Sequence, residues 1–150
     1  MPPLAHEIYK HLLRRVRANQ PSITYGELAA GLPARHATHH RSPRLHAALG
    51  EIALACRALG LPCLPAIVWS RELRRPSDGY YKVAHPRSRS EKSRVAAWER
   101  EHAAVVRDIA RYPATLPATL LATVSGADPA TGSATRSGNS AARDAKASAP

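Results

Sequence analysis

Thr24 and Glu27 form a capping signature that fixes where a helix begins in this chain. A Thr followed three residues later by Glu, just ahead of apolar residues, predicts the start of a helix. The hydroxyl accepts a hydrogen bond from one free amide of the first turn, and the carboxylate accepts one from another. Gly31 then ends this helix near Ala30. The fold must therefore place a very short helix early in the chain, with longer elements on either side.

Longer helices are predicted before and after this short one. Residues 4–18 place apolar side chains on one helical stripe, which is typical of a helix with one buried face. After a polar, cationic loop, Ser42 and Pro43 supply a hydroxyl cap and a proline at the first helical position. The helix that they start runs to Leu59, and Gly60 follows as the residue that commonly ends a helix.

Two strands and a final helix are predicted in the next part of the chain. The apolar run 64–69 is bounded by prolines and suits a short strand. Asp78 and Gly79 form a hairpin-turn signal, so residues 80–83 are expected to return as a second strand. Apolar positions spaced three and four apart then predict a helix over residues 90–111.

This order of elements predicts a helix-dominated α+β fold of the winged helix-turn-helix type, with a two-stranded wing and a C-terminal helix. We expect residues 1–112 to form this domain. Residues 113–150 turn to Ala, Thr, Ser, Gly and Pro and lose the periodic apolar pattern. They predict an apolar strap over 113–124 and a disordered tail beyond it.

The net charge of +11 indicates a polyanionic partner. Beyond residue 112 only three cationic side chains stand against two acidic ones, so nearly all of the excess lies in the predicted domain. Such an excess attracts phosphates and releases their counterions. Duplex DNA is the partner that we expect. The alternative is that the charge serves only solubility.

The cellular compartment is predicted from the cysteine spacing and from the lack of a signal-peptide or membrane-span pattern. Its two cysteines show no CxxC spacing, which argues against a disulfide framework and favours a reducing cytoplasm. No charged N-terminal region with an apolar run predicts a signal peptide. No stretch approaches the roughly 18 apolar residues that a membrane span requires. We expect a cytoplasmic protein without a membrane partner.

Candidate DNA contacts follow from the expected fold. In a winged helix-turn-helix, the second helix of the pair lies in the major groove and the wing touches the backbone. Arg44 is placed to reach base edges or phosphate, and Ser42, with the free amides of the first turn, to hold a phosphate. Further phosphate contacts are expected from cations of the loop, the connector and the wing, namely Arg35, Arg41, Arg71, Arg74, Arg75 and Lys82.

Three segments together resemble a known family. They are Ile-Thr-Tyr-Gly-Glu-Leu-Ala at residues 23–29, Arg44 at the start of the next helix, and Leu-Pro-Ala-Ile-Val-Trp-Ser-Arg at residues 64–71. They are similar to the C-terminal domain of the alkylguanine-DNA alkyltransferases, and more closely to the alkyltransferase-like proteins. Tyr80-Tyr81 and Trp98-Glu99 also resemble that family, so the similarity extends over about residues 9–102.

The resemblance implies roles for three side chains. In that family the residue corresponding to Tyr25 displaces a phosphate, and the one corresponding to Arg44 fills the space of a flipped guanine. Trp69 falls at the position of the alkyl-accepting Cys, where alkyltransferase-like proteins carry Trp. Because Trp69 and Ser70 replace the nucleophile box, alkyl transfer is not expected. Trp69 itself is either a core side chain or a platform on which a base stacks.

No catalytic or metal constellation is predicted, and no cofactor is expected. Cys56 lies on the apolar stripe of its helix, and Cys63 has no base nearby in sequence. His36, His39 and His40 occupy a loop without Cys or carboxylate at ligand spacing. We therefore expect a protein without enzymatic activity.

Three other functions stay open at this point. The first is an alkyltransferase-like sensor of DNA lesions. The second is a nuclease or a restriction-associated accessory domain, in which Glu72, Asp78 and Lys82 would surround a metal ion. The third is a protein-interaction module that uses the long apolar face of helix 43–59.

Overall fold

The computed structural model describes residues 3–117. Within them, five α-helices and a two-stranded parallel sheet are joined by three 3-10 helices. The α-helices and strands are α1 (Pro3–Arg17), β1 (Ile23–Thr24), α2 (Tyr25–Ala30), α3 (Pro43–Ala58), β2 (Val68–Trp69), α4 (Asp78–Ala84) and α5 (Glu91–Arg107). The 3-10 helices are η1 (Ala34–His36), η2 (Leu64–Ile67) and η3 (Ile109–Arg111). The chain therefore has the expected helix-dominated α+β composition.

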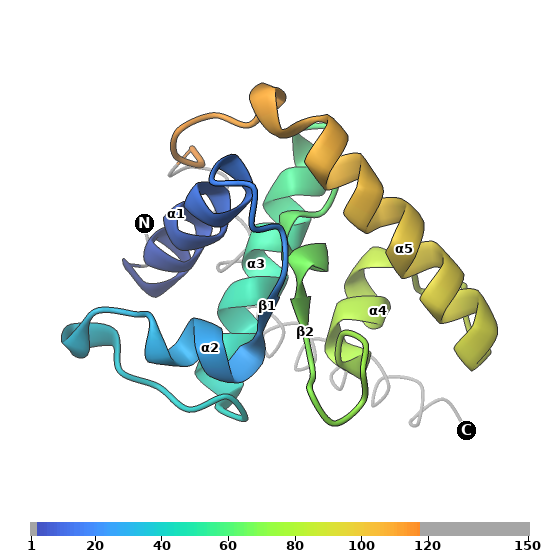
Figure 1. Ribbon diagram of the computed structural model, residues 1–150, viewed down its shortest axis with the longest axis horizontal. Coiled ribbons are helices and arrows are strands. Elements are labelled where there is room, and N and C mark those ends of the chain that lie inside the picture. The colour runs from blue at the N-terminus through green and yellow to red at the C-terminus, as the bar shows by residue number, and fades with distance from the viewer. Residues whose placement is uncertain (1–2, 118–150) are drawn as a thin grey trace, which may run out of the picture.

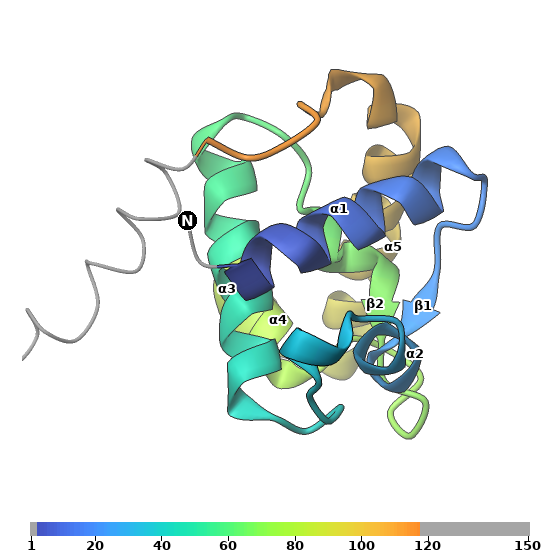
Figure 2. The same ribbon diagram turned by 90° about the vertical axis from the view of Figure 1, so that its left-hand side faces the viewer.

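Helix α3 is the central element. It packs against α1 on one side and α4 on the other, and η2 contacts both α3 and α5 (Figures 1 and 2). The side chains that fill the space between these elements are almost fully buried. They include Ile8, Tyr9, Leu12, Leu45, Ile52, Leu64, Ile67 and Val68. The loops at residues 37–42 and 70–75 extend from this core near the start of α3.

The three helices expected in the N-terminal half are confirmed. Thr24 and Glu27 form the predicted capping box, with Glu27 N donating to Thr24 Oγ1 at 3.1 Å and Thr24 N donating to Glu27 Oε1 at 3.0 Å. Ser42 caps α3 as expected. Gly60 ends it with a φ of 71°, and the amide of Leu61 returns to a carbonyl of the last turn.

The predicted wing is wrong. Residues 80–83 belong to α4 rather than to a strand, and of the predicted strand 64–69 only Val68–Trp69 is extended, since η2 precedes it. Tyr80 and Tyr81 show the reason, because both are buried, at 8% and 1% exposure. Successive side chains of a strand point to opposite faces, so a wing exposed on one side would leave one of these tyrosines in solvent. A helix that packs on α3 buries both.

The sheet pairs distant segments instead of a hairpin. β2 lies parallel to β1, with Ile23 opposite Val68 and Thr24 opposite Trp69. After β2 the chain turns back through residues 70–75, which an antiparallel bridge between Ser70 and Arg75 closes. We call this segment the 70–75 loop. It stands at the place in the chain where a wing was expected.

The C-terminal part of the described chain encloses the core. The final helix predicted over residues 90–111 is confirmed as α5, which ends at Arg107 before η3. Trp98 anchors it, since its Nε1 donates to the Ala66 carbonyl at 2.7 Å. Of the strap expected over 113–124, residues 113–117 are described. There Leu116 is buried and the Tyr9 hydroxyl donates to the Pro113 carbonyl at 2.6 Å. The predicted disordered tail lies outside the described residues.

Candidate nucleic-acid interface

One end of the molecule gathers the segments expected to bind DNA. The first turns of α2 and α3, residues 37–42 and the 70–75 loop lie along the lower edge of Figure 1. We call these four segments the loop face. Its exposed cations are Arg41, Arg44, Arg71 and Arg74.

The start of α3 is organised as the sequence predicted. Ser42 Oγ accepts a hydrogen bond from the amide of Arg44 at 3.1 Å, and Pro43 occupies the first helical position. The Arg44 side chain is exposed. Further along the helix, exposed positions such as Ala47 and Leu54 carry no hydrogen-bonding side-chain group. Arg44 is thus the group at this helix start best suited to contact a base edge or a phosphate.

The 70–75 loop is tightly constrained by its own hydrogen bonds. Ser70 N donates to the Arg75 carbonyl at 2.9 Å, Arg74 N donates to the Ser70 carbonyl at 2.8 Å, and Leu73 N donates to Ser70 Oγ at 3.1 Å. Arg74 has a φ of 60°, in a region where residues with a Cβ are uncommon. The loop thus has a single defined shape with Arg71 and Arg74 on its exposed surface.

Two parts of the loop face meet across an ion pair. Arg41 lies 3.5 Å from Glu72, and both side chains are largely exposed, so the pair is weak and opens at little cost. A largely apolar pocket of about 440 Å³ opens between these loops and α2, with Tyr25, Glu27 and Arg71 in its wall. Glu27 and Glu72 lie in this wall beside Arg71, so the wall carries no excess of positive charge.

Tyr25 is placed inside the molecule. Its side chain is 7% exposed, its hydroxyl is hydrogen-bonded to Ser77, and its ring lies 4.9 Å from that of His46. Burial raises the pKa of this hydroxyl, so it stays protonated at neutral pH. Tyr25 lines the wall of the loop-face pocket, but its hydroxyl already joins α2 to the start of α4.

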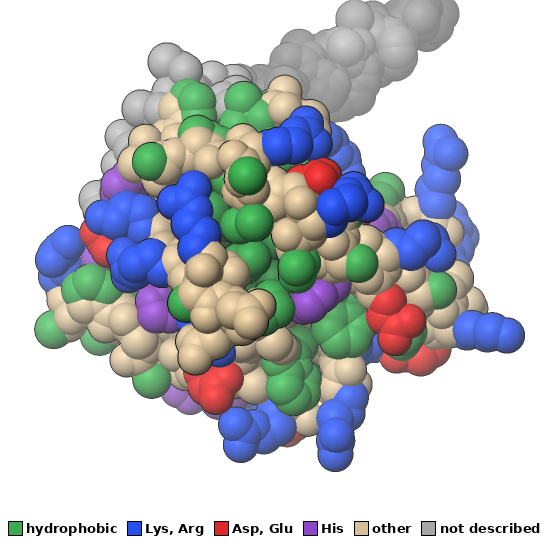
Figure 3. Space-filling view, turned by 45° about the horizontal axis from the view of Figure 1, so that its top comes forward, with side chains coloured by type: hydrophobic (Ala, Val, Ile, Leu, Met, Phe, Trp, Pro, Cys, Tyr) green, Lys and Arg blue, Asp and Glu red, His purple; other side chains and the backbone are tan. Residues whose placement is uncertain are grey.

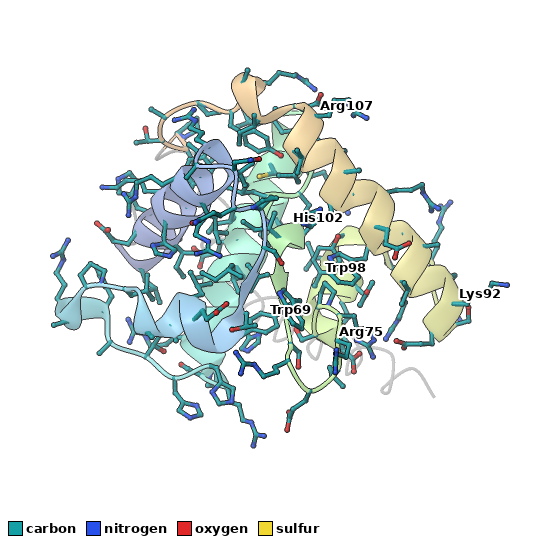
Figure 4. All side chains as sticks on the ribbon, in the orientation of Figure 1. Trp69, Arg75, Lys92, Trp98, His102 and Arg107 are labelled. Atoms are coloured by element: carbon teal, nitrogen blue, oxygen red, sulfur yellow. The ribbon has the colours of Figure 1, made fainter. Side chains whose placement is uncertain are left out.

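Arg75 is also structural. Its guanidinium lies 2.6 Å from Glu91 and 3.5 Å from Asp78, donates to the Pro76 carbonyl, and is 11% exposed. Arg94 pairs with the same Asp78 at 2.9 Å, and both guanidinium carbons lie near the ring of Tyr81, at 5.5 and 5.0 Å. Figure 4 shows Arg75 beside α4. This cluster joins the base of the 70–75 loop to α4 and α5, so the Arg75 side chain is not among the exposed cations of the loop face.

The remaining predicted contacts are dispersed. Arg35 of η1 pairs with Glu7 of α1 at 3.3 Å, and Lys82 is exposed on α4. Trp69 is half-buried on β2 beside the start of α2 (Figure 4). In Figure 3, Lys and Arg side chains are spread over several elements and outnumber the acidic ones on the visible face. The positive charge is therefore broad, and the loop face is distinguished by geometry rather than by charge alone.

The groups considered for catalysis are buried or paired. Burial raises the pKa of both thiols, to about 11 for Cys56 and well above the usual value for Cys63, so neither is a thiolate at neutral pH. Glu72 and Asp78 are each paired with arginines. Among residues 3–117, no group of three or more His, Cys, Asp or Glu side chains is arranged to hold a metal ion.

An apolar pocket between α3 and α4 was not anticipated from the sequence. It has a volume of about 260 Å³ and is walled by Tyr25, Leu49, Gly50, Pro65 and Tyr80, among others. A Cβ added at Gly50 would meet no atom within 4 Å, so the absence of a side chain there leaves the pocket wide. Residues of helix α4 form part of its wall, and the sequence predicted a hairpin turn and a strand in place of that helix.

Comparison with known proteins identifies no relative. No family model, curated protein or solved structure matches this chain. No helix within the described residues is long and apolar enough to cross a membrane.

Proposed function

We propose that this chain is a non-enzymatic protein that binds duplex DNA through its loop face, with α2 and α3 as a helix-turn-helix pair. The 70–75 loop takes the place of the wing. The observation that carries this proposal is that the segments bearing the exposed Arg41, Arg44, Arg71 and Arg74 lie at one end of the molecule. These cations come from three separate segments, and the Arg41–Glu72 pair joins two of them. Exposed cations on neighbouring segments can contact successive phosphates of a duplex.

The proposed binding is largely independent of sequence. Base edges are recognised by hydrogen-bonding groups aimed into a groove. On α3, Ala47 and Leu54 are exposed without such groups, and the His46 ring nitrogen is hydrogen-bonded to the His40 carbonyl at 2.9 Å. Arg44 alone has the reach and the donors for a base contact on the first turn. Affinity therefore comes mainly from phosphate contacts.

A direct titration tests the proposal. Fluorescence anisotropy of a labelled short duplex is measured against the protein at low salt, with and without magnesium, and the DNA is then run on a denaturing gel. We expect saturable binding at low salt, intact DNA in both conditions, and weaker binding for Arg44→Ala by about 1–3 kcal/mol if Arg44 contacts a base edge. Absence of binding at low salt would refute DNA binding. Magnesium-dependent cleavage would show an enzyme instead.

A second candidate function is sensing of alkylated bases, which the apolar pocket favours. Enzymes and sensors that recognise a base outside the stack need a pocket with aromatic or apolar walls. The pocket between α3 and α4 has Tyr25 and Tyr80 in its wall and lies next to the start of α3. The test compares duplexes with guanine or O-methylguanine at one position. Tighter binding of the alkylated duplex supports this function, whereas equal affinity for the two rejects it.

A further inference from the structure

Leu73 is displayed at the tip of the 70–75 loop. It is 48% exposed and is the most exposed large hydrophobic side chain in the described part of the chain. A single exposed leucine is common on protein surfaces and by itself indicates nothing. Its surroundings are what distinguish this one.

The residues around Leu73 are cationic. Arg71 and Arg74 lie on either side of it in the loop and are exposed, while the intervening Glu72 is paired with Arg41. In a duplex, stacked apolar bases lie between two charged phosphate backbones. An apolar side chain between two arginines has the same arrangement, so the leucine can face the bases while the arginines face phosphates.

The loop that carries Leu73 is held at both ends. At one end Trp69 is hydrogen-bonded into the sheet opposite Thr24, and at the other Arg75 is fixed by Glu91 and Asp78. Inside the loop, the amide of Leu73 is tied to Ser70 Oγ, and Arg74 keeps a positive φ. Little conformational entropy is therefore lost when this loop docks on a partner.

We propose that Leu73 inserts as an apolar wedge between adjacent base pairs of the bound duplex, while Arg71 and Arg74 contact the flanking phosphates. This inference rests on the proposed DNA binding and adds the mode of contact. Insertion separates two stacked base pairs, which costs energy, and burial of the leucine side chain together with the additional phosphate contacts offsets that cost.

A wedge of this kind predicts a preference for weak steps in DNA. Flexible pyrimidine–purine steps and mismatched pairs are easier to unstack than a fully paired, stiff step. The protein should therefore bind a duplex with one central mismatch more tightly than the same duplex fully paired. It should also unstack a base next to that position.

The experiment uses the full chain and two short duplexes that differ only in a central T·T mismatch, with 2-aminopurine beside it. Affinity is measured by anisotropy, and unstacking is measured by 2-aminopurine fluorescence. We expect the wild type to prefer the mismatched duplex by about 10-fold and to raise the fluorescence on binding. Leu73→Ala should lose the preference and the fluorescence rise, and Leu73→Met, which keeps an apolar wedge, should retain both.

Leu59→Ala is the matched control, because Leu59 is 38% exposed and follows the last turn of α3, at the end opposite the loop face. It should behave as the wild type does. The wedge is refuted if Leu73→Ala keeps the mismatch preference, or if the wild type binds both duplexes equally without a fluorescence change. In either of these cases salt-sensitive binding would leave the proposed function standing. Absence of binding to both duplexes at low salt would remove the proposed function and the wedge together.

Discussion

The hydroxyl of Tyr25 donates a hydrogen bond to Ser77 Oγ at 3.1 Å and accepts one from the Ser77 amide at 3.0 Å. These residues lie 52 positions apart in the chain, and their contact fixes the start of α2 against the start of α4. Ser77 occupies the N-cap position of α4, but its hydroxyl serves Tyr25 rather than the helix amides. Tyr25 also lines both the apolar pocket and the loop-face pocket, so one side chain borders the two cavities.

Replacement of Tyr25 by Phe tests this role. The substitution removes both hydrogen bonds and leaves the Ser77 amide without its partner, so the free energy of unfolding should fall by about 1–2 kcal/mol. Urea denaturation followed by circular dichroism measures the change. A variant as stable as the wild type would show that the contact contributes little. Reduced DNA affinity at unchanged stability would instead support the phosphate contact that the family resemblance implies.

Two glycines of similar sequence context are predicted to respond in opposite ways to alanine. Gly60 has a φ of 71°, so Gly60→Ala forces a Cβ into the left-handed region and should destabilise the fold by about 1 kcal/mol. Gly50 lies inside α3 with no atom within 4 Å of an added Cβ, so Gly50→Ala should stabilise the helix by about 0.5–1 kcal/mol. Thermal or urea unfolding of both variants checks the signs. Stabilisation by Gly60→Ala would contradict the conformation assigned to Gly60, and destabilisation by Gly50→Ala would contradict the open space beside Gly50.

Arg74 and Arg75 are neighbours in sequence with different predicted roles. Arg75→Ala removes ion pairs to Glu91 and Asp78 from a guanidinium that is nearly buried, so it should destabilise the fold by about 1–2 kcal/mol. Arg74→Ala removes an exposed cation of the 70–75 loop, so it should leave stability nearly unchanged and weaken DNA binding. Unfolding curves and anisotropy titrations of the two variants separate the roles. A stable Arg75→Ala protein would place the anchor of this loop elsewhere.

Stability is predicted to fall as the solution becomes mildly acidic. Burial lowers the pKa of His11 below its usual 6.5, with Arg14 and Arg15 acting in the same direction, and burial also lowers the pKa of His85. In the window just below pH 6.5 the unfolded chain therefore binds more protons than the folded one, so unfolding becomes easier as the pH falls through it. The free energy of unfolding measured over this range should decline.

Substitution of the two histidines provides the control for that decline. Replacing His11 and His85 together by Gln should flatten the pH dependence in this window, because neither side chain then takes up a proton. An unchanged decline in the double variant would assign it to other groups.

The sequence predicted correctly the helix ends that are set by contacts between residues close together in the chain. The Thr24–Glu27 capping box, the Ser42 cap and the terminating Gly60 each act within a few residues, and each helix boundary that they set is confirmed. The Asp78-Gly79 signal was misleading because the packing of two adjacent tyrosines against α3 outweighs the turn propensity of that dipeptide. Burial against α3 therefore made residues 78–84 a helix rather than a hairpin.

The candidate site was less accessible to prediction. The exposed cations of the loop face were identified from charge and helix position alone. Residue type did not distinguish the exposed Arg74 from Arg75, which lies in an ion-pair cluster. The two differ because Asp78 of α4 and Glu91 of α5 contact Arg75. The predicted hairpin did not include the helix α4 that carries Asp78. The apolar pocket and the Tyr25–Ser77 contact depend on the same misassigned helix.

The salt dependence of duplex binding by an Arg71→Ala, Arg74→Ala double variant tests whether the loop face binds DNA. The logarithm of the association constant is measured against the logarithm of salt concentration, with Arg107→Ala as the control. Arg107 lies at the far end of α5 and its loss changes the net charge in the same sense (Figure 4). We predict that the slope becomes shallower by about two for the double variant, because two phosphate contacts are lost, and stays as in the wild type for the control. Equal slopes for all three proteins would contradict DNA binding through the loop face.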